Sequence, residues 1–513
     1  MKSSFNGTTV KKVFYWAILA VFMSCFIPVG SLTAADSPYL CQGKGCTVAP
    51  DSAAATNKPA EFLNFAHTTD IHIVDEGNPI RAEELEVKNA NNPYIFADLF
   101  KNISAANRPI GPYTAELWEY EIEDINNADA VKPLDFMIAT GDFTDSSIIP
   151  EYRLFVEMID GVTLTRFNEH CDCRGVAGCE CDDEPATSIP GNPKGLDTDF
   201  YAAIGNHDVE YMGTFNTDGI IGLIVKELAQ GINIDELCYL EDLIGIYQKS
   251  DKSINFADMM EEESSLTGKV KGAYAFNPKP FIRCIVLNTC EYTYDLNGKA
   301  TPLENFSLGT LSIEQMSWLL NDIDANKDRI CIIFAHHGSR AFSPFIKNNS
   351  KYYVTGAELR EALKLKKNVV AYVDGHTHMN KIMAEYNTDG TGYWDITTSG
   401  IIDYPYEWRR ITVKDLGTGM GMIKCEMNRP VDLEKNVEKI DTEGDALHYG
   451  ADEDRNIELY FKMPLEVAQA IIAEKPKPDQ PPADDPIDDN KTQTEDNSDS
   501  GSSSMCFMTS ALI

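Results

Sequence analysis

Five short clusters of aspartate, asparagine and histidine interrupt this sequence, and each directly follows an apolar run. In chain order they are Asp70-Ile-His72, Gly141-Asp142, Gly205-Asn206-His207-Asp208, His336-His337 and Gly375-His376-Thr377-His378. Buried polar groups are costly unless they are paired or hold a metal. Imidazole and carboxylate are good ligands for zinc, manganese and iron. The clusters therefore predict a site for metal ions.

The spacing of the clusters suits a pair of divalent cations. The first and last clusters each place two ligand-type residues two positions apart, so an extended chain would aim both to one side. Asp142 stands where two metals need a shared ligand, and a carboxylate has two oxygens with which to bridge. Asn206 would add a neutral oxygen. Cysteine is missing from the set, which argues against a structural zinc site.

The apolar runs that precede the clusters predict β-strands. FLNFAHTTD, DFMIATGD, DFYAAIGNHD, RICIIFAHHG and NVVAYVDGHTH, together with RCIVLNTC, are nearly continuous rather than alternating. Such runs are typical of strands buried on both faces of a layered α/β domain. Ligands of open α/β sheets bind beyond the carboxyl ends of the strands. We therefore expect all five clusters to face one crevice.

One helix and several later strands can be placed from their patterns. LSIEQMSWLLNDIDANK has Ser312 and Gln315 at capping-box spacing, and it predicts a helix packed on the sheet. Its apolar face would comprise Met316, Leu319, Leu320 and Ile323. GYWDITTSGIIDYPYEWRRITVKDLG and GMIKCEM predict further strands, and MPLEVAQAIIAEK predicts a final helix.

The domain is expected to span residues 61–430, with insertions at about 143–198 and 209–272 that could overhang the site. Residues 1–34 resemble a secretory signal peptide, basic and then apolar, although an uncleaved membrane anchor is the alternative. Residues 35–60 are expected to be a linker and 431–474 a C-terminal extension. Residues 475–505 are expected to be disordered. The apolar tip at 506–513 could be a sorting or lipidation signal, or a frayed end.

The chain has 13 cysteines, a high number that suits an oxidising compartment. Cys171, Cys173, Cys179 and Cys181 predict a disulfide-stapled insertion, with a zinc knot as the alternative. Cys41 and Cys46 could close a small loop, whereas Cys284 and Cys331 lie in apolar runs and are expected to be buried. His448 and His170 are expected to be surface or structural residues.

The composition is that of a globular protein, with 43% hydrophobic and 24% charged residues. The formal net charge of -36 repels phosphate backbones, so no nucleic-acid partner is expected.

Over residues 62–400, the motif order D-x-H, G-D, G-N-H-[DE], H, G-H-x-H resembles the calcineurin-like metallophosphoesterases. The resemblance implies an α/β fold, a four-layer β-sandwich flanked by helices, with a two-metal centre at one edge. It implies one metal on Asp70, His72 and His378, another on Asn206, His336 and His376, and Asp142 as the bridge. His337 is the alternative to His336.

The same resemblance implies the chemistry. Two divalent ions, manganese, iron or zinc, would lower the pKa of water toward about 7, so that hydroxide attacks phosphorus. His207 would be the general acid rather than a ligand, and Asp208 would orient its ring. Purple acid phosphatases have a tyrosine where this chain has Asp145, so a tyrosinate-bound ferric centre is not expected. Arg340, Arg409 and Arg410 could bind phosphate or form structural ion pairs.

We therefore expect an exported phosphoesterase, whether periplasmic, secreted or at the cell surface. Its substrate would be a small-molecule or lipid phosphoester, a diester in preference to a monoester. A terminus could attach it to a membrane or cell surface. The alternative is a surface-attached binding protein on the same scaffold with little or no turnover. A structural metalloprotein would leave His207 without a role.

Overall fold

A computed structural model describes residues 40–42, 51–75, 110–162, 193–210, 213, 246, 272–290, 307–342, 353–430 and 448–473. The strands are β1 (Leu40–Gln42), β2 (Ala60–Thr68), β3 (Phe136–Ala139), β4 (Phe200–Ala202), β5 (Tyr274–Phe276), β6 (Ile282–Val286), β7 (Ile330–Phe334), β8 (Val369–Asp374), β9 (Lys381–Tyr386), β10 (Gly392–Thr397), β11 (Trp408–Asp415), β12 (Met420–Asn428) and β13 (Ile457–Lys462). The helices are α3 (Thr114–Val131), α4 (Ile149–Asp160), α5 (Asn206–Val209), α9 (Ile313–Ala325), α10 (Gly356–Lys364) and α12 (Leu465–Ile472).

The strands form two mixed sheets, in the orders β1-β13-β12-β11-β2-β3-β4 and β5-β6-β7-β8-β10-β9. In the first sheet β2, β3 and β4 are parallel, and in the second β6, β7, β8 and β10 are parallel. The five polar clusters follow β2, β3, β4, β7 and β8. The expectation that each cluster ends a buried strand is confirmed.

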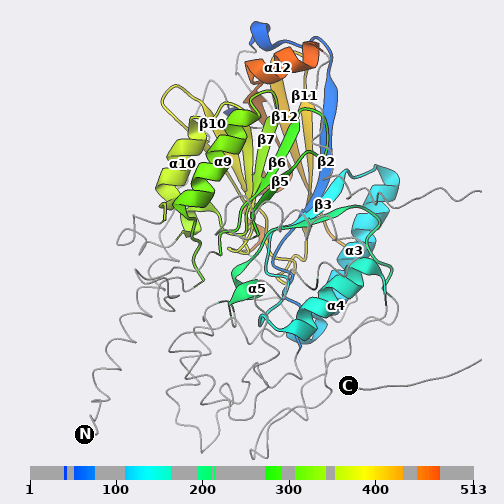
Figure 1. The fold of residues 1–513 in the computed structure, drawn as a ribbon. Helices are drawn as coiled ribbons and strands as arrows, with labels where there is room; N and C mark the ends of the chain where they lie inside the picture. Colours follow the sequence, from blue (N-terminus) through cyan, green and yellow to red (C-terminus); the bar gives the residue numbers. More distant parts are fainter. Residues whose placement is uncertain are drawn as a thin grey trace, which may run out of the picture. The chain divides into compact units, whose positions relative to one another are not determined.

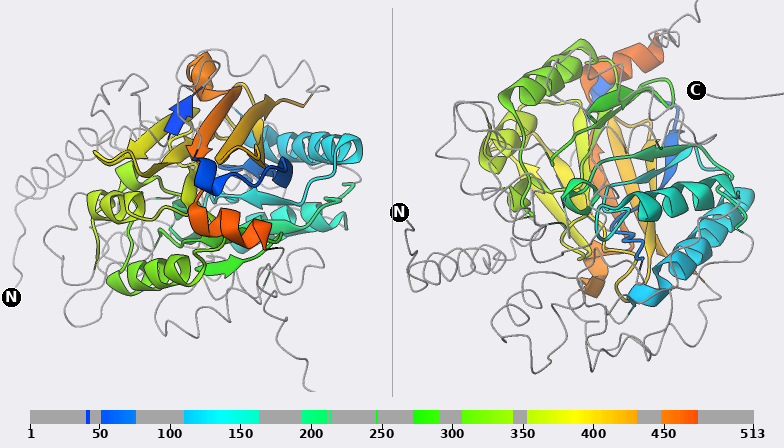
Figure 2. Two further views of the ribbon diagram at one scale, coloured as in Figure 1. Left: turned by 90° about the horizontal axis from the view of Figure 1, so that it is seen from above. Right: turned by 60° about the horizontal axis from the view of Figure 1, so that its bottom comes forward.

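The two sheets pack face to face between two layers of helices. Figures 1 and 2 show α3 and α4 beside the first sheet and α9 and α10 beside the second. Strand β7 shows the layering, because Ile332 and Phe334 join the core between the sheets while Cys331 and Ile333 join the core under α9 and α10. The predicted α/β fold, a four-layer sandwich, is confirmed.

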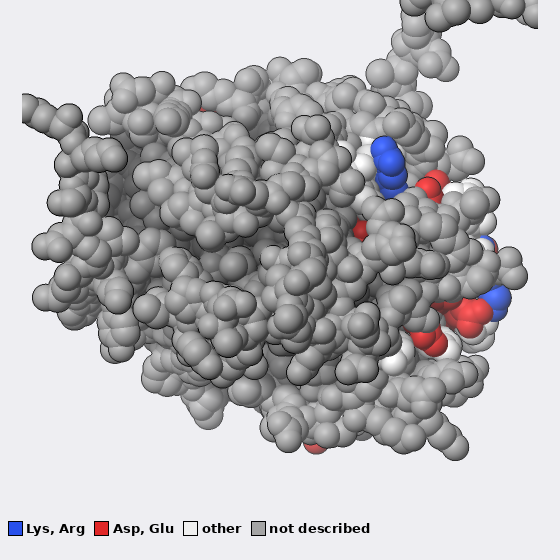
Figure 3. Space-filling view, turned by 90° about the horizontal axis from the view of Figure 1, so that it is seen from below, with Lys and Arg blue, Asp and Glu red and all other residues white. Residues whose placement is uncertain are grey.

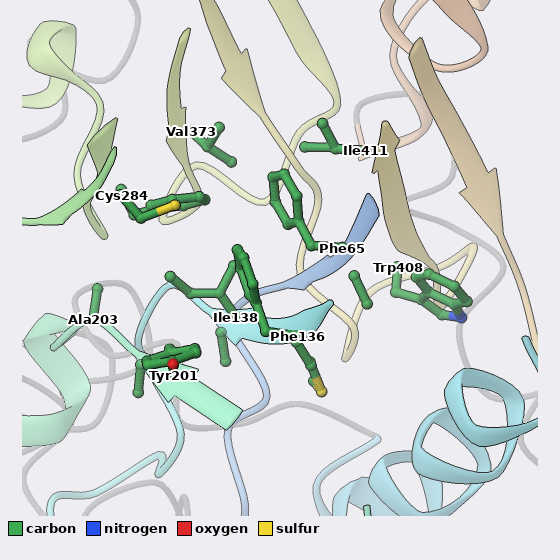
Figure 4. Packing of buried hydrophobic residues seen from close by; sticks show 14 of the residues in the cluster. Phe65, Phe136, Ile138, Tyr201, Ala203, Cys284, Val373, Trp408 and Ile411 are labelled. Atoms are coloured by element: carbon green, nitrogen blue, oxygen red, sulfur yellow. The ribbon is translucent and has the colours of Figure 1, made fainter. Parts of the chain in front are cut away.

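Aromatic side chains fill the space between the sheets (Figure 4). The ring of Phe65 on β2 lies 5.0 Å from that of Phe136 on β3 and 5.6 Å from that of Phe334 on β7, centroid to centroid. Phe65 and Phe136 belong to the first sheet, whereas Cys284 and Val373 approach from the second (Figure 4). This packing fixes the two sets of parallel strands against each other, and with them the strand ends that carry the clusters.

Helix α9 begins where predicted, but only one of the two hydrogen bonds of the predicted capping box accounts for it. The Ser312 hydroxyl accepts a hydrogen bond from the Gln315 N–H at 3.1 Å. The Gln315 side chain does not return to Ser312; it pairs with the backbone N–H and C=O of Asn288 instead. Gln315 thus ties the helix to the segment after β6.

Segments outside the expected domain complete the first sheet. β1 lies in the predicted linker and pairs with β13, and its Leu40 is buried. That part of residues 35–60 is therefore a strand, because β13 offers it an edge to pair with. β13 and α12 lie in the predicted extension.

Cys284 and Cys331 are buried as expected, and Cys290 and Cys425 are also buried. The predicted signal peptide, the four clustered cysteines, Cys46, His170 and the C-terminal tail lie outside the described residues. Within the described part of the chain, no helix is long and apolar enough to cross a membrane. On the face seen in Figure 3, the described charged side chains of both signs lie beside one another.

A buried histidine links the stability of the fold to pH. The ring nitrogens of His67 on β2 contact the hydroxyl groups of Thr398 and Thr140, each at 2.8 Å. Burial is the main cause that lowers the pKa of His67 to about 3. An unfolded histidine has a pKa of about 6.5. As pH falls from 6.5 toward 3, the unfolded chain therefore takes up a proton that the native protein does not, and the native state loses stability.

Between pH 7 and pH 5, this single group is expected to cost the native state about 2 kcal/mol. His67→Gln cannot take up the proton, so it should lose about 2 kcal/mol less than the wild type over that interval. Urea denaturation of both proteins at the two pH values, with a chelator present, measures the difference. An equal loss in both proteins would contradict the assignment.

Candidate metal centre

The strand ends bring the predicted ligands into adjoining groups of possible metal-binding atoms. Four groups have ligand atoms within 4.8 Å of one another, and all four draw only on the predicted clusters. They are Asp70-His72-His378, Asp70-Asp142-His336, His72-Asp142-His207 and His336-His337-His376. Among the described residues, no such group forms elsewhere. The crevice expected from sequence is therefore present.

The first metal position is defined here by Asp70, His72, His378 and Asp142. Asp70 Oδ1 lies 3.1 Å from His378 Nε2 and 3.8 Å from His72 Nε2. The His72 Nε2 atom lies 3.6 Å from Asp142 Oδ2. Four atoms from three strand ends thus surround one point.

The second metal position is defined by Asn206, His336, His376 and Asp142. Asn206 Oδ1 lies 2.9 Å from His336 Nε2 and 3.1 Å from His376 Nδ1. His336 Nε2 also lies 3.2 Å from Asp142 Oδ2. The same Asp142 oxygen therefore approaches a histidine of each position, as a bridging ligand must.

Both the spacing and the unmet hydrogen bonds of these atoms fit metal ions. Ligand atoms that share one cation at about 2.1 Å lie about 3.0–3.4 Å apart in octahedral or tetrahedral geometry. The distances at the second position, 2.9–3.2 Å, and the 3.1 Å from Asp70 to His378 are close to this range, whereas the two distances to His72 are longer, at 3.6 and 3.8 Å. Asp70 Oδ1 and His72 Nε2 are buried and have no hydrogen-bond partner among the described residues. Such orphaned polar atoms are costly unless a ligand satisfies them. The donor set of carboxylate, imidazole and amide suits divalent zinc, manganese or iron.

The charges in the site also favour bound metal ions. Burial works against protonation of His378, but Asp70 and Asp403 outweigh it and raise its pKa to about 10. Burial likewise opposes protonation of His336, yet Asp142 and Asp70 raise its pKa to about 9. The buried carboxylates thus draw positive charge into the site, and bound cations would supply it in place of protons.

The backbone of the ligand residues is left-handed, which corrects one expectation. The ligand residues with φ between 47° and 65° are Asp70, His72, Asp142, His376 and His378. The Asp-x-His and His-x-His pairs are therefore not aimed by an extended chain but by consecutive tight bends. Non-glycine residues in this region cost about 1–3 kcal/mol each and concentrate at functional sites.

Two glycines let these bends pack together. A Cβ on Gly205 would lie 2.1 Å from Asp142 Oδ1, and one on Gly141 would lie 2.6 Å from the Gly205 backbone nitrogen. A side chain at Gly205 would displace Asp142, and one at Gly141 would collide with the Gly205 backbone and with His336 Nδ1. The glycines of the G-D and G-N-H-D motifs are thus required by close approach.

The ligand histidines are held through their second nitrogen. His72 Nδ1 contacts Asp145 Oδ1 at 3.1 Å, and His336 Nδ1 donates to the Thr140 carbonyl at 2.7 Å. Such contacts leave Nε2 for the metal. His337 uses both nitrogens elsewhere, on Thr289 and on the Ser307 carbonyl. The geometry therefore favours His336 as the ligand, and Asp145 is a contributor that the sequence reasoning missed.

Asp208 does not orient the His207 ring, contrary to expectation. Its carboxylate accepts hydrogen bonds from the N–H groups of Asp142, Phe143 and Gly205, at 2.8–2.9 Å. His207 Nδ1 instead donates to the Asp145 carbonyl at 2.6 Å. The physical reason is that the left-handed bend at Asp142 presents N–H groups that need a buried acceptor. Asp208 thus fixes the backbone of Asp142.

The amide of Asn206 is oriented from the start of the second insertion. Asn206 Nδ2 donates to the Gly213 carbonyl at 2.8 Å, so its Oδ1 faces the second metal position. A Cβ on Gly213 would lie 2.2 Å from His207 Nε2. Gly213 therefore lies against the site, and most of residues 209–272 lies outside the described residues.

The arginines considered for phosphate binding have structural partners. Arg340 pairs with Glu385. Arg409 is fully buried, with hydrogen bonds to backbone and side-chain oxygens that include Thr398 Oγ1. Arg410 donates to the Ala128 carbonyl.

Comparison with known proteins gives one family. The family model described as calcineurin-like phosphoesterase matches residues 63–380. No curated protein matches the chain.

Solved structures match only distantly. A dimetal phosphatase from Danio rerio is 14% identical with a TM-score of 0.34, covering 72% of this chain and 100% of that one. A purple acid phosphatase from yellow lupin seeds is 10% identical with a TM-score of 0.29, covering 74% and 53%. A sulfate thiohydrolase from Thermus thermophilus is 10% identical with a TM-score of 0.31, covering 75% and 60%. At such TM-scores these likenesses carry no weight for function.

Proposed function

Because the chain belongs to the calcineurin-like phosphoesterase family, we propose that it is an exported two-metal hydrolase of phosphodiesters. The observation that carries this proposal is the approach of one Asp142 oxygen to His72 and to His336, at 3.6 and 3.2 Å. A single carboxylate between two sets of ligands is the arrangement that a pair of cations needs. A two-metal site clamps both the attacking and the leaving oxygen of an in-line displacement.

The residues divide the work in this proposal. Two divalent cations, when bound, supply Lewis acidity and lower the pKa of water toward about 7. Asp70, His72 and His378 would hold the first cation, and Asn206, His336 and His376 would hold the second. Asp70, His72 and His336 are fully buried, so bulk water screens their interaction with the metals and the substrate phosphate only weakly.

His207 is proposed to donate the proton that the leaving oxygen takes up. Burial lowers the pKa of its ring to about 4 in the free protein. An anionic phosphoester beside the ring favours its charged form, which then carries a proton on Nε2. With Nδ1 fixed on the Asp145 carbonyl, Nε2 is the nitrogen left to give a proton to the departing oxygen.

Export and the substrate class rest on the sequence. A basic pair followed by an apolar run and small residues supports a signal peptide at residues 1–34. The net charge of -36 disfavours polyanionic partners and leaves small-molecule or lipid phosphoesters. Attachment to a membrane or cell surface through a terminus would suit a lipid phosphoester.

Hydrolysis of bis(4-nitrophenyl) phosphate and of 4-nitrophenyl phosphate by the purified protein with added Mn²⁺ tests the proposal. Turnover of both is expected to need metal, and kcat/KM should be higher for the diester. The chelator-treated protein is the control. Preference for the monoester would make the protein a phosphatase, and no turnover of either at full metal occupancy would contradict the proposed activity.

A further inference from the structure

The loop between β10 and β11 passes directly behind the first metal position. The Ile401 N–H donates to the Thr69 carbonyl at 3.2 Å, which ties this loop to the bend that carries Asp70. A Cβ on Gly400 would lie 2.9 Å from Asp70 Cβ and 3.0 Å from His378 Nδ1. Only glycine permits this approach, so the residues that follow Gly400 are held against His378.

Asp403 uses this approach to contact the metal-binding histidine. Its Oδ2 atom accepts a hydrogen bond from His378 Nδ1, and the opposite ring nitrogen, Nε2, faces Asp70 Oδ1 at 3.1 Å. The Asp403 backbone is fixed on both sides, since its N–H donates to Gly400 and its carbonyl accepts from the Tyr406 N–H at 2.8 Å. The carboxylate is therefore placed by the loop.

His448 braces the same histidine from the C-terminal segment. His448 Nδ1 donates to the His378 carbonyl at 2.6 Å, and His448 Nε2 lies 4.0 Å from Asp403 Oδ1. The Asn380 N–H donates to the His448 carbonyl at 3.1 Å. His448 thus binds the backbone of His378 and lies beside Asp403, the carboxylate partner of the His378 ring.

We propose that Asp403 is a positioning residue that orients His378 for the first metal position, and that His448 braces this pair. This inference rests on the two-metal site proposed above. An anionic partner on Nδ1 fixes the tautomer and raises the basicity of the ligating nitrogen. In the second metal position, by contrast, His336 Nδ1 faces a neutral group, the Thr140 carbonyl. Asp403 therefore acts on the first metal position and not on the second.

Titration of the chelator-treated full-length protein with Co²⁺ tests the inference. Calorimetry measures the affinity, and NMR records the hyperfine-shifted N–H signals of the ligand histidines. We expect two equivalents in the wild type. Asp403→Ala should weaken one equivalent by about 10- to 100-fold and remove one exchangeable imidazole signal. Asp403→Asn, which can still accept the Nδ1–H bond, should keep the signal and recover part of the affinity. His448→Ala should weaken the same equivalent by about two- to tenfold, the range for one lost hydrogen bond.

Asp322→Asn is the matched control, because Asp322 is also an ion-paired carboxylate of low exposure, 13% against 16% for Asp403. It lies on α9, and its variant should bind two equivalents as the wild type does. Unchanged affinity and signals in both Asp403 variants, with two Co²⁺ bound by the wild type, would overturn this inference alone. A wild type that binds no Co²⁺ would overturn the proposed function as well.

Discussion

Asp142→Ala is expected to abolish hydrolysis and to empty both metal positions. Asp142 Oδ2 is the atom that both positions share, and Oδ1 accepts the His207 N–H at 2.8 Å. The variant therefore loses the bridge and the anchor of the proposed general acid together. Loss of one preorganised transition-state contact alone costs about 10²–10³-fold, so a fall in kcat/KM of at least about 10³-fold is expected.

Metal content after dialysis and kcat/KM for the diester measure this result. Asp135→Ala is the matched control, because Asp135 directly precedes β3 whereas Asp142 follows it. The Asp135 carboxylate accepts the Asn64 N–H at 2.9 Å, far from the clusters along the strand. Its variant should keep both metals and the activity. An Asp142→Ala protein that retained two metals and full turnover would remove Asp142 from the bridge.

The strands were predictable because their sequence signal is local. A run such as RICIIFAHHG needs no partner to be recognised, and it became β7 with His336 directly beyond its end. The order of the clusters along the chain resembles that of the calcineurin-like metallophosphoesterases, and this resemblance implied the ligands. β1 was missed because three residues paired at a sheet edge carry too little pattern, and their strand character depends on β13, more than 400 residues later.

The parts of the site that were not predicted depend on backbone shape or on distant segments. Nothing local shows that Asp70 and His72 adopt left-handed φ values, because the cost of that conformation is met by packing elsewhere in the fold. The family resemblance placed Asp208 on the His207 ring, whereas in the structure its carboxylate accepts the N–H groups of the bend at Asp142. Asp403 is 25 residues from His378, and only the folded loop brings the two together.

His207→Ala is expected to lower turnover by about 10²–10⁴-fold, the usual contribution of a general acid, while two metals remain bound. The reason is that His207 lies beside the ligands without being needed by them. Its Nδ1 donates to the Asp145 carbonyl, and its backbone N–H donates to Asp142 Oδ1. The ligand histidines face the other oxygen, Asp142 Oδ2. Metal content should therefore equal that of the wild type, in contrast to Asp142→Ala.

The identity of the leaving group makes this prediction sharper. A 4-nitrophenolate ion leaves readily without a proton, whereas an alkoxide does not, so only the latter depends strongly on a general acid. For His207→Ala, we expect a far larger loss with an alkyl phosphodiester than with bis(4-nitrophenyl) phosphate. Partial loss of folding or of metal would lower the ratio of variant to wild-type kcat/KM by the same factor for both substrates. The comparison of the two ratios therefore controls for folding and metal binding. Equal losses on both substrates would mean that His207 positions the phosphate instead, and the proton would then have to come from another group.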